Sequence, residues 1–175
     1  MLSVSLLGGG TVLPDTDHVA RTCKKSSLDQ ETNSPTPASF EFRLGEDGKW
    51  KDAYLSVNWL EYLLCGNADV AEKLSALRQY QVDNPFELAL IKPTKGNVYA
   101  VVPVAAVSVD MPDDIGVELE CHHEPHATAT IDPHSGVLPQ PGVDTWPSDA
   151  NTAAHLAVQQ ILFQAICHWE KGILD

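Results

Sequence analysis

The residues of this chain best suited to chemistry at neutral pH lie in a histidine-rich stretch that begins at Cys121. The stretch contains His122, His123 and His126, and His134 follows eight residues after His126. The ordinary pKa of imidazole lies near neutrality, and imidazole and thiolate are both zinc ligands. The stretch therefore indicates acid–base catalysis or metal binding, although it matches no complete signature of either.

Cys121, His123 and His126 are the candidate metal ligands of this stretch. On a strand, Cys121 and His123 would point to the same face because side chains alternate, and His126 could fold back after the proline that precedes it. His134 or Cys167 could complete a tetrahedral zinc site. The spacing is not that of a zinc finger, a zinc knuckle or the helical HExxH motif, so a zinc-stabilised domain stands as an alternative.

The charge balance limits the partners that this chain can bind. Lysine and arginine total 11 and aspartate and glutamate total 24, which gives a formal net charge of −13. Proteins bind nucleic acids through cationic side chains that displace the counterions of phosphate groups. Because this chain has few such side chains, we expect it to bind neither DNA or RNA directly nor an anionic membrane surface. We expect the partner to be another protein that carries a basic or apolar groove.

The cysteines and the start of the chain bear on the compartment. The four cysteines are spread singly, with no CxxC pair, which is typical of reduced thiols rather than of a disulfide framework. Residues 1–7 are apolar but lack the basic leading region of a secretory signal. No apolar run approaches the ~18 residues of a membrane span. We therefore expect a cytoplasmic protein.

The elements that must position these residues follow from hydrophobic periodicity. Val70, Leu74 and Leu77 share one face of a helix predicted over 67–79, and Asn58 could cap a short helix through 59–63. Alternation and turn signals predict the strands. The predicted strands cover residues 17–23, 40–44, 53–57, 87–91, 97–102, 117–122 and 127–131.

The last predicted helix is the strongest, and its apolar stripe includes Leu156 and Ile161, with Trp169 near its end. It is long enough to lie across a sheet or against a partner, so these three residues are the candidate interface. Strands that cluster in the middle of the chain favour an α+β fold. We expect a mainly antiparallel sheet with a short central helix and a long C-terminal amphipathic helix.

The length of 175 residues suits one domain over 1–175. We expect a flexible or loosely packed N-terminus at 1–14 and a mixed α+β core at 15–132. A proline-rich loop is predicted at 133–147, and the C-terminal helix at 148–172.

Four segments carry a resemblance: DHVAR (17–21), ASFEFR (38–43), LSVNWLE (55–61) and PHATATI (125–131). In this order they resemble a group of small bacterial accessory proteins with no assigned activity, over roughly residues 15–132. The resemblance singles out His18, Arg21, Ser56 and His126 as polar positions that would converge on one site, and these are the candidate catalytic residues. An arginine and a histidine that flank a strand bearing a serine could bind an anionic small molecule or a nucleotide.

The acidic balance, the lack of a complete catalytic set and the amphipathic C-terminal helix predict a non-enzymatic adaptor or regulatory subunit. It would act through protein–protein contacts in the bacterial cytoplasm, and one setting is a multi-gene system such as phage defence. The alternative is a small enzyme or a nucleotide- or anionic-ligand-binding domain that uses His18, Arg21 and His126. A pocket where these three side chains meet would favour the alternative, and scattered positions would favour the adaptor.

Overall fold

A computed structural model describes residues 11–42, 54–83, 98–107, 118–125, 132–140 and 153–171. In these ranges an antiparallel seven-stranded sheet has the strand order β1-β5-β6-β3-β2-β4-β7. The strands are β1 (Thr11–Val12), β2 (His18–Cys23), β3 (Leu55–Trp59), β4 (Val98–Pro103), β5 (Glu118–His123), β6 (His134–Gln140) and β7 (His168–Lys171). The helices are α1 (Val70–Asp83), α2 (Val104–Val107) and α3 (Ala153–Gln164), with the 3₁₀ turns η1 (Lys25–Ser27) and η2 (Pro37–Phe40).

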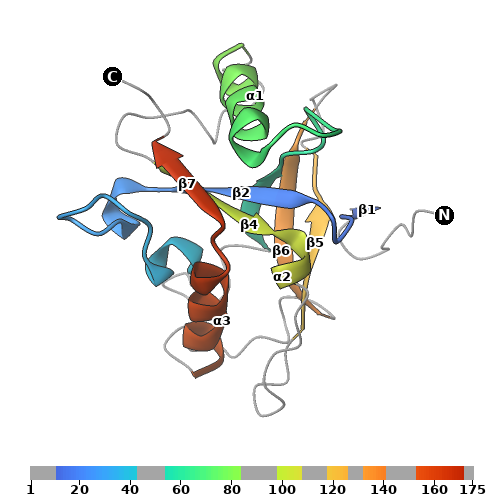
Figure 1. The fold of residues 1–175 in the computed structure, drawn as a ribbon. Coiled ribbons are helices and arrows are strands. Elements are labelled where there is room, and N and C mark those ends of the chain that lie inside the picture. Colours follow the sequence, from blue (N-terminus) through green and yellow to red (C-terminus); the bar gives the residue numbers. More distant parts are fainter. Residues whose placement is uncertain are drawn as a thin grey trace.

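The two longer helices lie on opposite sides of the sheet (Figure 1). Leu74 and Leu77 of α1 pack with Ala20 of β2, whereas Val158 and Leu162 of α3 belong to the cluster that contains Val19. Neighbouring residues of a strand point to opposite faces of the sheet. Val19 and Ala20 therefore belong to two separate cores, one on each face. We call these sides the α1 face and the α3 face of the sheet.

Arg21 joins two strands where their own hydrogen bonds stop. β2 and β3 pair only at Val19–Trp59 and Ala20–Asn58, and the strands then separate. The Arg21 guanidinium bridges the gap, because Nε donates to the Ser39 carbonyl at 3.0 Å and Nη1 donates to the Ser56 carbonyl at 2.7 Å. The side chain thereby fixes η2 against β3.

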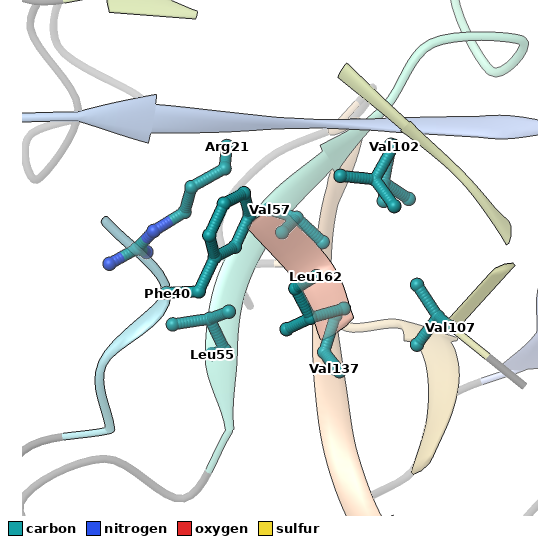
Figure 2. A pocket seen from close by; sticks show the side chains of 9 residues that line it. Arg21, Phe40, Leu55, Val57, Val102, Val107, Val137 and Leu162 are labelled. Carbon is teal, nitrogen blue, oxygen red and sulfur yellow. The ribbon is translucent and has the colours of Figure 1, made fainter. Parts of the chain in front are cut away.

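A small void lies beside Arg21 on the α3 face (Figure 2). Its volume is about 10 Å³, and its lining is apolar except for Arg21. The lining residues are Val19, Arg21, Phe40, Leu55, Val57, Val102, Val107, Val137 and Leu162. A space of this size holds at most one water molecule and offers it few polar partners, so the void is a packing gap and not a ligand site.

The helices of the described ranges are short. The longest, α1, has 14 residues, and none combines the length and the apolar character needed to pass through a bilayer.

The predicted fold class was wrong in its C-terminal part, because no long helix occupies 148–172. The helix α3 ends at Gln164, and the chain then extends into β7. The N–H of Cys167 donates to the Val101 carbonyl at 3.0 Å, and β7 pairs with β4. Pairing with the open edge of β4 outweighs the helical periodicity of the sequence here, since propensity is weaker than tertiary contact. The architecture is an antiparallel sheet with short helices.

The proline-rich loop predicted at 133–147 was also wrong where it is described. Residues 134–140 form β6, which pairs with β3 on one side and with β5 on the other. Pro139 fits because β3 covers β6 only as far as Val137, so the missing N–H faces a side without a strand partner in the described ranges. A proline therefore disfavours a strand only where its missing N–H would have to donate to a neighbouring strand.

Three smaller predictions need correction. Phe40 ends η2 rather than beginning a strand, because the Ser39 N–H donates to the Thr36 carbonyl at 2.9 Å and closes a 3₁₀ turn. Residues 60–63 form turns rather than a short helix. Residues 11–14 are not loosely packed, since β1 pairs with β5 and Leu13 is buried. The strand predictions at 87–91 and 127–131 lie outside the described residues.

Replacing Arg21 by alanine should lower the free energy of unfolding by about 2–4 kcal/mol, because two main-chain carbonyls lose a charged donor. Arg21→Lys should recover only part of this loss, since one ammonium group cannot reproduce the fork of the guanidinium. Urea unfolding would measure both effects. Lys24→Ala, at an exposed position of the same chain segment, is the control and should change stability by less than about 0.5 kcal/mol. An equally small effect of Arg21→Ala would contradict this role.

Candidate functional site

Polar side chains gather at one end of the sheet, where β2 and β6 begin and β3 and β5 end. Main-chain hydrogen bonds tie these strand ends together: Leu60 N–H donates to the His18 carbonyl at 3.1 Å, and Glu124 N–H donates to the His134 carbonyl at 2.9 Å. We call residues 17–18, 59–62, 122–124 and 132–134 the histidine end of the sheet. It holds His18, His122, His123 and His134, and therefore most of the histidines that the sequence singles out.

His18 and Lys73 share one carboxylate at this end. Glu61 Oε1 lies 2.8 Å from His18 Nδ1 and 3.1 Å from Lys73 Nζ, and Glu61 Oε2 accepts the His18 main-chain N–H at 2.8 Å. The Glu61 side chain is only 8% exposed, so the pair with Lys73 is largely removed from water. The Glu61 carboxylate thus orients the His18 imidazole, as in catalytic dyads, and Lys73 offsets the charge of that carboxylate.

The pKa of Glu61 reflects two opposing effects. Burial alone would raise it, but hydrogen bonds from the His18 main chain, the His18 ring and Lys73 hold the pKa below its ordinary value of 4.5. Hydrogen bonds to the charged form outweigh desolvation here. Glu61 is therefore a structural anion that holds His18.

His123 belongs to an aromatic cluster. Its ring centroid lies 4.7 Å from that of Tyr62 and 5.6 Å from that of Trp59. Its Nε2 lies 2.6 Å from the Asp132 carbonyl, which can only accept, so Nε2 carries the proton. Trp59 Nε1 in turn donates to Asp17 Oδ2 at 2.8 Å. The ring is held by tilted and edge-on aromatic contacts and by one hydrogen bond.

Ser56 and His134 form the arrangement most like a reactive pair. Ser56 Oγ lies 2.7 Å from His134 Nε2, and His134 Nδ1 lies 2.6 Å from the Glu124 carbonyl. Because the carbonyl accepts, Nδ1 donates, and Nε2 of the neutral ring is left to accept the hydroxyl proton of Ser56. The His134 ring is buried, whereas Ser56 keeps part of its surface exposed.

The structure does not bring the predicted catalytic residues into one site. His18 and Arg21 are three residues apart on β2, so their side chains point to opposite faces of the sheet. Arg21 binds main-chain carbonyls on the α3 face, one of which belongs to Ser56, and Ser56 Oγ pairs with His134 instead. His126 lies outside the described residues.

The predicted metal ligands do not form a cluster in the described ranges. Cys121 is buried in the core of the α3 face, and burial raises the pKa of its thiol to about 12, which disfavours the thiolate that zinc requires. His123 is engaged with Asp132, and β5 and β7 are separated by four strands, which keeps Cys167 away. Among the described residues no three His, Cys, Asp or Glu side chains could hold a metal ion.

The three candidate interface residues have different environments. Trp169 is 42% exposed and Leu156 is 54% exposed, but Ile161 packs against the core of the α3 face. The helical stripe therefore splits: Ile161 stabilises the fold, and Leu156 and Trp169 remain available at the surface.

The participants in these networks that the sequence analysis did not predict include Lys73, Asp132 and the Glu124 carbonyl. Lys73 carries a detectable signal, because it lies between Val70 and Leu77 on the apolar stripe of α1, where a lysine needs a buried partner. A main-chain carbonyl has no sequence signal at all.

Comparison with known proteins gives no match: no protein-family model, no curated protein and no solved structure matches this chain. The resemblance to small bacterial accessory proteins stays a prediction, and the role of the site rests on its own geometry.

Glu61→Gln should destabilise the protein by about 2 kcal/mol at pH 7, because charged hydrogen bonds to His18 and Lys73 are weakened. The folded-state pKa of Glu61 is lowered, so its stabilising effect is fully present above the ordinary value of 4.5 and is lost as the pH falls through the lowered pKa. Unfolding by urea across a pH series would show the two proteins converging in acid. Glu31→Gln, at an exposed site, is the control, and a difference that is constant from neutral pH into acid would refute the assignment.

The four thiols should react with a disulfide reagent in a defined order. Cys65 and Cys167 are exposed, whereas Cys23 and Cys121 are buried and burial raises the pKa of both of these thiols. We expect Cys65 to react first, then Cys167, whose pKa is also raised by burial, and the buried pair only after unfolding. Mass spectrometry of partly labelled protein would give the order, and early labelling of Cys121 would contradict it.

Proposed function

We propose that this protein is an adaptor or regulatory subunit that binds another protein along the outer edge of β7. The occupant is an extended segment of a net basic protein, which adds to the sheet as a further strand. The observation that carries this proposal is the position of Trp169, an exposed aromatic side chain on the last strand of the described sheet.

An outer strand offers main-chain donors and acceptors to a partner strand. β7 pairs with β4 on one side and has no strand partner on the other side within the described ranges. Strand addition at such an edge is a common mode of peptide recognition, with affinity from main-chain hydrogen bonds and specificity from side chains. Trp169 would supply the aromatic anchor, since tryptophan is enriched among the residues that dominate binding energy.

The edge is held in place by α1. Arg78 Nη2 pairs with the Glu170 carboxylate and donates to the Lys171 carbonyl at 2.8 Å, and His168 Nε2 lies 2.9 Å from Glu170 Oε2. These contacts fasten a four-residue strand that would otherwise be weakly paired. A preorganised edge loses less conformational entropy when it binds.

Charge supports a basic partner. The net charge of −13 attracts a cationic protein at long range and repels nucleic acid and anionic membranes. A bacterial cytoplasmic setting, such as a multi-gene phage-defence system, is part of the proposal and rests on the resemblance of the sequence segments.

The small-ligand alternative receives less support from the described geometry. It required His18 and Arg21 to face one pocket, but the two side chains lie on opposite faces of β2, and Arg21 is occupied by main-chain carbonyls.

Affinity capture with the wild-type chain, repeated with the Trp169→Ala variant, tests the proposal. We expect a stoichiometric basic partner whose capture falls at least tenfold in Trp169→Ala, since an aromatic anchor contributes about 2 kcal/mol or more. Capture should weaken as the salt concentration rises. A photoreactive amino acid at position 169 should crosslink to an extended segment of that partner.

Leu156→Ala is the matched control, because this side chain is also apolar and exposed but lies on α3. It should leave capture unchanged, and a photoreactive group at position 156 should give no crosslink. The proposal fails if the chain is stable, monomeric and without a stoichiometric partner, if Trp169→Ala retains the partner, or if the captured species is a second copy of this chain.

A further inference from the structure

The α1 face of the sheet carries a hydrogen-bonded relay that ends at a serine hydroxyl. It runs from the Glu124 carbonyl through Nδ1 and Nε2 of His134 to Ser56 Oγ, with separations of 2.6 Å and 2.7 Å. The order of groups is that of a nucleophile, a general base and an acceptor that orients the base. A main-chain carbonyl takes the place that a carboxylate usually holds.

The register of β3 and β6 creates this contact. Trp59 N–H donates to the Pro133 carbonyl at 2.8 Å, so by alternation Asn58–His134 and Ser56–Gly136 are pairs without mutual hydrogen bonds. Such pairs bring their Cα atoms to about 4.5 Å, which lets the diagonal neighbours Ser56 and His134 meet. The contact is therefore set by the backbone of a central part of the sheet.

Gly136 on β6 leaves room for the Tyr54 ring beside Ser56. A Cβ atom at this position would lie 2.6 Å from the Tyr54 ring and 2.8 Å from Tyr54 Cβ, so only glycine fits. The Tyr54 ring lies 5.6 Å from the His134 ring, and on the other side of Gly136 β5 places His122. His122 is buried, and its Nδ1 has no hydrogen-bond partner among the described residues, so it is a further polar atom in the same row.

The Asp132 carboxyl group lies beside the base, because the His134 main-chain N–H donates to Asp132 Oδ1 at 2.9 Å. A carboxylate beside His134 favours the imidazolium that forms when the ring accepts a proton, and it repels an anionic substrate.

We propose that Ser56 and His134 form a nucleophile–base pair that hydrolyses small, uncharged or cationic esters. The Glu124 carbonyl is a positioning group, since it acts through the ring of His134. This activity is separate from docking at β7, because β2 and β4 lie between β3 and β7 in the sheet.

The reaction has two balanced steps. The Ser56 Oγ–H proton passes to His134 Nε2 while Oγ bonds to the acyl carbon, and the ester C–O bond breaks as the alcohol leaves with that proton. Water then gives a proton to Nε2 and adds to the acyl carbon. The Ser56 ester bond breaks, the carboxylic acid leaves, and the proton returns to Oγ.

An uncharged fluorophosphonate probe tests the nucleophile. We expect one covalent adduct, located at Ser56 by peptide mapping, which disappears in Ser56→Ala and persists in Ser26→Ala, where an exposed serine is removed. His134→Gln should slow labelling at least ~100-fold, which is the lower end of general-base effects. Hydrolysis of p-nitrophenyl acetate should fall in the same two variants.

Ser56→Cys keeps the test decisive if His134→Gln does not fold. A thiol at position 56 beside His134 should react with iodoacetamide faster than Cys65 at pH 6, because an adjacent imidazole favours the thiolate. The proposal is overturned if the probe leaves Ser56 unmodified, if it modifies Ser56 no faster than Ser26, or if the thiol at position 56 reacts more slowly than Cys65.

Discussion

The centre of this structure depends on the two hydrogen bonds that the Arg21 guanidinium donates to main-chain carbonyls. β2 and β3 share only two residue pairs, and beyond them the main-chain carbonyl of Ser56 faces a gap instead of a strand. Arg21 donates to that carbonyl and to the carbonyl of Ser39, so it joins β2, β3 and η2 in one step. A buried carbonyl without a donor costs free energy, and a guanidinium can satisfy two carbonyls because its donors form a rigid fork. α3 packs on the surface that results.

Hydrogen-bond acceptors hold the imidazoles in place at the histidine end of the sheet. Glu61 binds both His18 and Lys73, and the carbonyls of Glu124 and Asp132 each hold one histidine ring. Each carbonyl assigns a proton to one ring nitrogen, so the tautomers of His123 and His134 follow from the backbone path. This explains why these histidines form separate pairs within the described ranges rather than a metal cluster.

The two proposals rest on different features of the structure. Docking at β7 uses a strand edge that is unpaired within the described ranges, an exposed indole and a net charge of −13, and none of these requires an enclosed pocket. The Ser56–His134 pair uses the register of the two neighbouring strands β3 and β6 and partly buried hydrogen bonds. Since two strands separate these regions, each can be altered without removing a contact of the other.

Local patterns in the sequence located several elements, including strands near β2, β4 and β5 and the helix α1, because periodicity directly reflects which side of an element is buried. They failed at β6 and β7, where prolines and a helical stripe were overruled by pairing with distant strands. The sequence singled out His123 and His134 by residue type, and His18, Arg21 and Ser56 through the resemblance of its segments, but their roles depended on partners elsewhere in the chain. Ser56 and His134 are 78 residues apart, and Glu61 and His18 are 43 apart. The sequence by itself determined the acidic charge, the reactive groups and the local periodicity; only the tertiary structure decided which groups meet, because strand register and main-chain carbonyls have no signature in residue type.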